Sequence, residues 1–159
     1  FNPEMIIAIL DQRKTCARQL VEFLPGKNPT RTGYVKDGLM LYNETNEPCI
    51  KNTPYKKDDI LYVVGTDVAH IWLKVTDVKL ERLQDITDDG AKAEGINDEW
   101  ACNWWHPSYN DPDSGGYPLY KDTFADEWNK TIKETDINHY GWKTNPWVWV
   151  IYFELYKIH

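Results

Sequence analysis

Residues 71–96 constrain the fold of this chain more than any other stretch of its sequence. Apolar residues alternate with more polar ones up to Val75, and Val78 and Leu80 then continue the alternation in the opposite phase. Because successive side chains of a β-strand point to opposite faces of a sheet, a change of phase means that the strand takes up one extra residue. The sequence therefore predicts one long strand with a β-bulge at residues 76–77.

A short helix is predicted directly after this strand. Thr87 is a residue type that caps helix N-termini, and the acidic side chains of Asp88 and Asp89 suit the positive end of the helix dipole. Gly95 is a typical residue for the end of a helix, which places Glu94 in its last turn. The predicted unit is thus a bent strand that leads into a short helix ending in an acid.

The rest of the chain divides into elements by the same criteria of periodicity, capping and turn residues. In chain order we expect a helix capped by Asn2 that stops near Gln12, a strand at 14–24, a hairpin over 33–40 that turns at Asp37-Gly38, a loop at 43–55, a strand at 60–64 buried on both faces, a helix capped by Asp122 with Phe124, Trp128 and Ile132 on one side, and a central strand at 147–156. Strands outnumber helices. The predicted fold class is therefore α+β and mainly β, a small antiparallel β-barrel with about three flanking helices.

The length of 159 residues and the hydrophobic content of 42% fit one domain over residues 1–159 with a full-sized core. Within this domain, residues 97–120 form an irregular insertion in which tryptophans and tyrosines are mixed with Pro, Gly and Asp. An aromatic side chain left in water would forfeit roughly 1.5–3 kcal/mol, so we expect the insertion to pack against the body of the domain.

The formal net charge of −7 argues against broad affinity for DNA or any phosphate backbone, although it leaves room for a local basic pocket. The three cysteines and four histidines lack the spacing of metal ligands or of a disulfide framework, so neither a metal site nor a cofactor is predicted. No apolar run is long enough to span a membrane. The unpaired cysteines favour the reducing cytoplasm as the location.

Four blocks of the sequence resemble the ASCH domain, in the version found in phage and prophage proteins. They cover somewhat under half of the chain and follow one another in the family's order: FNPEMIIAILDQRKTCAR at 1–18, YKKDDILYV at 55–63, LKVTDVKLERLQDITDDGAKAEGI at 73–96 and YGWKTNPWVWVIYFE at 140–154. The resemblance implies the PUA-like superfamily, and hence a small β-barrel with a cleft, RNA binding or RNA-related chemistry, and the host cytoplasm if a phage encodes the chain. One bacterial branch of the family is an amidohydrolase that removes acetyl groups from N4-acetylcytidine with a Lys, a Thr and a Glu.

The family's Lys-Thr-x-Thr motif falls on Lys14, Thr15, Cys16 and Ala17, and its glutamate falls on Glu94. Lys14 and Glu94 match the motif, whereas Ala17 stands where the family has its second threonine. An alanine has no oxygen that attacks a carbonyl carbon. The resemblance therefore implies that the family's chemistry is lost or changed here unless a neighbouring residue replaces the threonine.

Each candidate residue also has a purely structural explanation. A cation such as Lys14 is favourable at the carbonyl end of a helix, and Glu94 is a residue type common on solvated helix faces. Cys16 lies beside Lys14, whose charge would favour a thiolate nucleophile. Adjacent strand residues point to opposite faces, however, so Cys16 need not occupy the place that Ala17 vacates.

Three functions from different classes fit these observations. The first, which we favour, is a PUA-like module that binds RNA or a nucleotide-sized ligand without turnover, in a cleft formed by Arg13, Lys14, Thr15, Arg18 and Glu94. The second is an amidohydrolase acting on an acylated nucleoside, with Lys14 as general base and Glu94 as proton donor. The third is a phage interaction protein whose aromatic insertion grips a host or phage protein. The first two require Lys14 and Glu94 to meet in one hollow.

Overall fold

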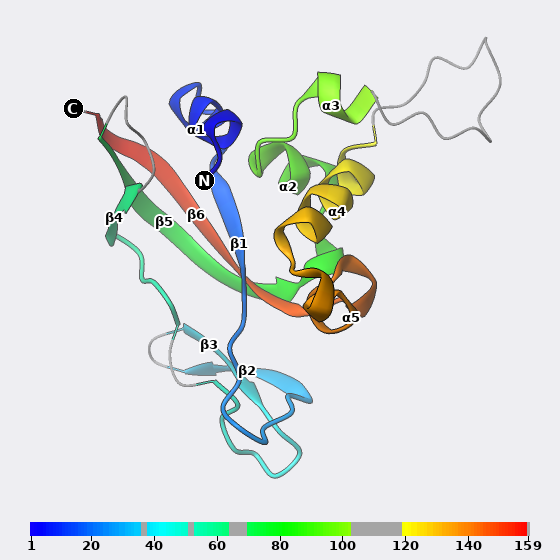
Figure 1. Ribbon diagram of the computed structural model, residues 1–159. Coiled ribbons are helices and arrows are strands. Elements are labelled where there is room, and N and C mark those ends of the chain that lie inside the picture. The colour runs from blue at the N-terminus through cyan, green and yellow to red at the C-terminus, as the bar shows by residue number, and fades with distance from the viewer. Residues whose placement is uncertain (36–37, 51–52, 64–69, 103–118, 159) are drawn as a thin grey trace, which may run out of the picture.

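The computed structural model describes residues 1–35, 38–50, 53–63, 70–102 and 119–158. Within these residues the chain forms a mixed α/β fold built on a curled antiparallel sheet of four strands, consistent with a small barrel-like fold (Figure 1). The strand order across this sheet is β1-β6-β5-β4, with bounds Cys16–Leu20, Trp147–Ile158, Ile71–Arg82 and Ile60–Val63. The long strands β5 and β6 form the middle of the sheet, as predicted for residues 147–156, and β1 and β4 are its edges.

β5 is the long bent strand that the change of phase predicts. Its register against β6 shifts between Val75 and Asp77, which confirms the bulge at residues 76–77. Leu73 and Val75 are buried before the bulge and Leu80 is buried after it. The extra residue therefore keeps the apolar side of the strand turned to the core along its whole length.

Five α-helices are present in the described part of the chain, at Pro3–Leu10 (α1), Asp88–Ala93 (α2), Asp98–Cys102 (α3), Tyr120–Thr131 (α4) and Ile137–Tyr140 (α5). The prediction of about three helices was too low, because α3 and α5 are too short to show a helical period in the sequence. Thr87 caps α2 as predicted, since its hydroxyl accepts a hydrogen bond from the N–H of Gly90 at 3.1 Å. None of the described helices combines the length and the apolar character needed to cross a membrane.

α4 begins earlier than the sequence predicts. Its N-cap is Leu119, so Asp122 is not the cap and lies instead in the first turn, where its carboxylate still complements the helix dipole. Phe124 and Trp128 are buried, and Ile132 packs against the same core cluster. The predicted apolar side of the helix is therefore confirmed although its start is not.

The prediction that residues 60–64 are buried on both faces was wrong. β4 is an edge strand, and both Ile60 and Tyr62 are exposed. The ring of Tyr62 stacks on His70 and contacts Trp72, so the aromatic side chains of this outer surface cover one another. A short apolar run does not reveal this difference, because an edge strand with an aromatic surface has the same composition as a buried strand.

Residues 31–42 form a hairpin that belongs to a second, two-stranded sheet. β2 (Arg31–Val35) pairs antiparallel with β3 (Gly38–Tyr42), while the expected turn residue Asp37 lies outside the described residues. Leu41 of β3 is buried in a cluster with Trp149 of β6. The hairpin thus packs on one face of the main sheet.

The aromatic insertion predicted at residues 97–120 contains α3 and the first residue of α4. Trp100 and Tyr120 pack in the main core cluster, so the two described ends of this stretch lie on the body of the domain, while the packing of the insertion as a whole stays a prediction. Its other aromatic residues, Trp104, Trp105, Tyr109 and Tyr117, lie outside the described residues. The interaction role considered for this insertion stays a prediction.

The two faces of the main sheet bury different partners. On one face, Cys16 of β1 and Val148 and Val150 of β6 pack against the buried side chains of α2, α3 and α4. On the other face, Phe153 of β6 packs with Ile9 of α1. β1 therefore has helices near both of its faces, and the candidate residues lie where α1 and α2 approach it.

Candidate functional site

Lys14 lies in the connection between α1 and β1. Gln12 adopts a left-handed backbone conformation, with φ of 59°, which reverses the chain after the helix. The N–H of Lys14 then donates to the carbonyl of Ala8 at 2.9 Å, and the N–H of Thr15 donates to the carbonyl of Ala93 at 2.8 Å. These bonds hold Lys14 between α1 and the end of α2.

Glu94 is the C-cap of α2, directly after the last helical residue Ala93. It is followed by Gly95 with φ of 102°, a conformation that glycine adopts without strain. A Cβ atom on Gly95 would lie at the ordinary van der Waals distance of 3.4 Å from the side chains of both Ala8 and Lys14, so the end of α2 lies directly against the α1–β1 connection. As a result, Lys14 Nζ lies 2.7 Å from Glu94 Oε2 across a sequence separation of 80 residues.

The lysine and the glutamate are both buried and fully hydrogen-bonded. They are only 4% and 6% exposed. Lys14 Nζ donates to Glu94 Oε2 and to the Glu94 carbonyl, each at 2.7 Å, and to the Cys16 carbonyl at 2.9 Å. An ammonium group has three donors, so all of them are used. The second carboxylate oxygen, Glu94 Oε1, accepts from Arg18 Nη1 at 3.0 Å.

Arg18 extends this network to Glu81 on β5. Its side chain is 3% exposed, and its Nη2 donates to Glu81 Oε1 at 2.7 Å. Burial lowers the pKa of Arg18, but the charge of Glu94 and the hydrogen bond to Glu81 raise the pKa more, so the guanidinium stays charged. Two cations and two carboxylates thus form a buried network without net charge, and each charge has the partner that burial requires.

One donor in this network has no partner among the described residues. Arg18 Nε is buried and makes no hydrogen bond. A buried donor without an acceptor costs about 1–3 kcal/mol, because it loses its hydration and gains nothing in return. A ligand atom that accepted a hydrogen bond from Arg18 Nε would recover part of that free energy.

Cys16 is buried between the two cations but is a poor nucleophile. Burial, and then the negative charge of Glu94, raise the pKa of its thiol to about 12, although Arg18 and Lys14 act in the opposite direction. The thiolate is the reactive form of cysteine. At neutral pH Cys16 therefore stays a thiol and does not act as a nucleophile in place of a threonine hydroxyl at position 17.

We expect the Cys16 thiol to make the protein less stable as the pH rises above about 9. The ordinary pKa of 9.0 applies in the unfolded chain and a pKa of about 12 in the folded protein, so between these values only the unfolded chain loses the thiol proton. The unfolded state then binds fewer protons, and the free energy of unfolding falls by up to about 1.4 kcal/mol per pH unit. Urea unfolding of wild type and Cys16→Ala between pH 9 and 10 tests this. Equal slopes in the two proteins would contradict it.

A hollow of about 310 Å³ opens beside the charged network. Lys14, Arg18 and Glu94 of the network line it, and we call them the polar wall; Asn2, Glu127 and Thr131 are further polar residues of the lining. The remaining wall is mainly apolar and includes Phe1, Met5, Ala17, Ile96, Phe124 and Trp128. The position at which the family resemblance would place a second threonine thus opens on the same hollow as Lys14 and Glu94.

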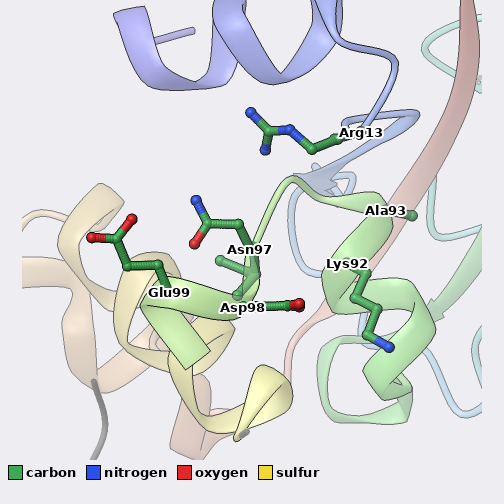
Figure 2. Close-up of a pocket in the computed structure, with 7 residues that line it drawn as sticks. Arg13, Lys92, Ala93, Asn97, Asp98 and Glu99 are labelled. Carbon is green, nitrogen blue, oxygen red and sulfur yellow. The ribbon is translucent and has the colours of Figure 1, made fainter. Parts of the chain in front are cut away.

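Arg13 lies in a neighbouring pocket rather than in this hollow. That pocket, of about 490 Å³, is formed by the α1–β1 connection, the end of α2 and the start of α3. Figure 2 shows Arg13 extending over it, above Asn97 and Glu99. The guanidinium pairs with Asp11 at 3.2 Å, and both side chains are exposed, so this ion pair has little influence on stability.

Thr15 is also outside the hollow. Its side chain is exposed, and its backbone serves the fold, because its N–H donates to Ala93 and its carbonyl accepts from the N–H of Phe153 at 2.9 Å. The structure thus brings together Lys14, Arg18 and Glu94 out of the five predicted ligand residues.

Glu81 and the aromatic residues of the hollow were not predicted as site residues. Glu81 follows the bulge of β5 and lies on the same face of the strand as Lys79. The alternation of these two residues with buried Leu80 predicts a polar face, but it does not show that Glu81 contacts Arg18. Phe124 and Trp128 were expected as the buried side of a helix, and they are. Their position at the rim of a hollow depends on where α4 packs, which the helical period does not specify.

The described residues contain no group of three or more His, Cys, Asp or Glu side chains that could hold a metal ion. The chain was also compared with protein-family models, with curated proteins and with solved structures. None of the three comparisons found a match.

Proposed function

We propose that the hollow beside Lys14 and Glu94 binds a nucleoside-sized ligand, either free or as an unpaired base of RNA, and that it does so without turnover. This is the function expected of an ASCH domain of the PUA-like superfamily. The observation that carries the proposal is the convergence of a buried charged network and three aromatic rings on one hollow. Size, shape and hydrogen-bonding capacity each support it.

The size of the hollow favours a ligand of one base and its sugar. Its volume of about 310 Å³ is at the lower end of the range of roughly 300–1,000 Å³ that is typical of small-molecule pockets. A longer RNA would therefore place only one unit in the hollow. The rest of the strand would remain on the surface.

The aromatic wall favours a planar ligand. Phe1, Phe124 and Trp128 come from the N-terminus and from two turns of α4, and they line the hollow together. Stacking of a base on an aromatic side chain contributes about 1–3 kcal/mol and does not depend on the identity of the base. These rings would supply affinity, and the polar groups would supply specificity.

The polar wall favours an uncharged base edge over a phosphate. The three donors of Lys14 are engaged, both oxygens of Glu94 are engaged, and the charges of Lys14 and Arg18 are balanced by two carboxylates. A phosphate would require cations that are free to pair with it. The unpartnered Arg18 Nε is buried in this wall, so it donates to a carbonyl oxygen or ring nitrogen of the ligand only once the ligand displaces the atoms that cover it.

The absence of turnover is proposed because Ala17 lines the hollow at the position of the family's second threonine. Lys14 and Glu94 alone offer proton transfer but no covalent nucleophile. The neighbouring Cys16 does not substitute, because its raised pKa keeps it a thiol. Binding therefore fits this hollow better than hydrolysis does.

We expect Lys14→Met to weaken nucleoside and RNA binding by at least about tenfold, which corresponds to about 1.4 kcal/mol. The substitution frees Glu94 from one of its two cations and so disorders the polar wall. Fluorescence titration of labelled single-stranded RNA and calorimetric titration of cytidine, uridine, adenosine and guanosine provide the measurement. Lys79→Met is the matched control, because Lys79 also lies over an aromatic ring, that of Tyr152, but on an exposed part of β5. Equal affinity of both variants, or no binding by wild type, would refute the proposal.

A further inference from the structure

A third concavity, besides the hollow and the Arg13 pocket, runs along the edge of the main sheet, beside β1. It has a volume of about 740 Å³ and is lined on one side by consecutive residues 18–23. On the other side it is lined by Trp128, Thr131 and Ile132 at the end of α4 and by Tyr140 of α5. Side chains of consecutive strand residues point to alternate faces, so a run of six can line one concavity only where it faces the edge of the strand. We call this concavity the β1 groove.

The backbone of β1 is open on the side of the groove. Among the described strands β6 alone pairs with β1, and the hydrogen bonds at the two ends of β1 show which residues make that pairing. The carbonyl of Thr15 accepts from Phe153, and the N–H of Val21 donates to Trp147. In an antiparallel ladder alternate residues direct both backbone groups to the same side. The odd-numbered residues therefore face β6, and the N–H and C=O groups of Arg18 and Leu20 face the groove.

The side chains beside this open edge are apolar and accessible. Phe23 is 40% exposed and Tyr140 is 45% exposed. A further concavity of about 260 Å³, lined in part by Leu20, Phe23, Tyr140 and Pro146, continues from the groove. An extended chain laid along β1 would thus find apolar surface for the alternate side chains that it directs toward α4 and α5.

The charges of the groove fit a polypeptide and not a nucleic acid. The guanidinium of Arg18 is already paired with Glu81 and Glu94, so it offers no free cation to a phosphate. Glu22 is exposed and has no ion-pair partner among the described residues. Together with the net charge of −7, this acid would repel a phosphate backbone and attract a lysine or arginine side chain.

We propose that the β1 groove binds an extended polypeptide segment, which adds to the main sheet as a strand beside β1. The peptide backbone would pair with the open N–H and C=O groups of Arg18 and Leu20, as in other cases of strand addition to a sheet edge. Its alternate side chains would be apolar and face the groove, and it would carry a basic residue opposite Glu22. This interaction surface is separate from nucleoside binding, although Arg18 and Trp128 border both the groove and the hollow.

The experiment selects peptides from a displayed library of random segments of about a dozen residues, longer than the typical strand. We expect the selected peptides to show apolar residues at every second position together with a lysine or arginine. Leu20→Pro should weaken binding of a synthesised selected peptide by at least about tenfold, because proline removes the open N–H without removing any bond to β6. Leu20→Ala, which keeps the N–H and removes the side chain, is the matched control. Glu22→Lys should weaken the same peptide and restore affinity when its basic residue is changed to glutamate.

Hydrogen exchange keeps the test decisive if Leu20→Pro does not fold. In wild type, the bound peptide should slow exchange of the Arg18 and Leu20 amides, which face the groove, more than exchange of the Gln19 amide, which already pairs with β6. Failure to select any peptide, equal binding by Leu20→Pro and Leu20→Ala, or unchanged exchange at Arg18 and Leu20 would overturn the proposal. Protection of the same amides by single-stranded RNA but not by peptides would also overturn it and assign the groove to nucleic acid.

Discussion

Replacing Glu94 with glutamine lowers the free energy of unfolding by about 3–5 kcal/mol, the expected result of removing the central charge of a buried network. Glu94 accepts hydrogen bonds from both Lys14 and Arg18, which are themselves almost fully buried. Glutamine keeps the shape of the side chain but presents an amide group with no charge. Lys14 would then be buried without any carboxylate partner, and Arg18 would keep only Glu81. Urea unfolding at neutral pH measures the loss.

Glu81→Gln is the control for this experiment. Glu81 also binds Arg18, at 2.7 Å, but its side chain is 25% exposed and is solvated in part. Its replacement leaves Glu94 with both cations, so we expect a loss within about 1 kcal/mol. Similar losses for Glu94→Gln and Glu81→Gln would show that the network is not centred on Glu94, and the account of the polar wall given above would fail.

The sequence predicts well those elements that depend on the pattern of consecutive residues in the chain. The bulge of β5 follows from the change of phase after Val75, and the N-cap of α2 follows from Thr87 and the two acids after it. β4 was predicted wrongly because an apolar run carries no information about its neighbours in the sheet. What decides its exposure is that β4 is an edge strand of the described sheet and that the described elements leave open the face that carries Ile60 and Tyr62.

The site shows a similar limit. Lys14 and Glu94 were connected through a family resemblance, since nothing in local spacing relates residues 80 positions apart. Arg13 was grouped with Lys14 because the two are adjacent, yet the chain turns at Gln12 and sends Arg13 into the pocket of Figure 2. Two residues that are adjacent in the sequence therefore have neighbouring backbones, but their side chains can lie in different pockets. Only the packing of α1 and α2 against β1 decides which side chains meet.

Ala17→Thr is expected to confer hydrolysis of N4-acetylcytidine on a protein for which we propose binding without turnover. Ala17 lines the hollow with Lys14 and Glu94, although its side chain packs against the cluster of Ile9 and Phe153, so the hydroxyl of a threonine there reaches the base and the acid only in a rotamer that turns into the hollow. In the expected reaction Lys14 first passes a proton to Glu94 along their 2.7 Å hydrogen bond. The neutral amine then takes the hydroxyl proton as the oxygen attacks the acetyl carbonyl, and Glu94 gives its proton to the leaving amine of cytidine. Water then cleaves the acetyl ester on the threonine and releases acetate. We expect a rate at least about a hundredfold above wild type, measured by chromatography of cytidine.

Ala17→Val is the matched control for this gain of activity, because valine has nearly the shape of threonine and the same preference for a strand but no hydroxyl. If the new hydroxyl is the nucleophile, the valine variant stays inactive and Ala17→Thr loses its activity when Lys14 is also changed to methionine. Equal turnover by the threonine and valine variants would mean that the hydroxyl plays no part. If both variants fold and bind cytidine but neither reacts, Lys14 and Glu94 are too firmly engaged with each other and with Arg18 to exchange protons. The network would then serve binding alone, and the lack of a hydroxyl at position 17 would not be what prevents hydrolysis.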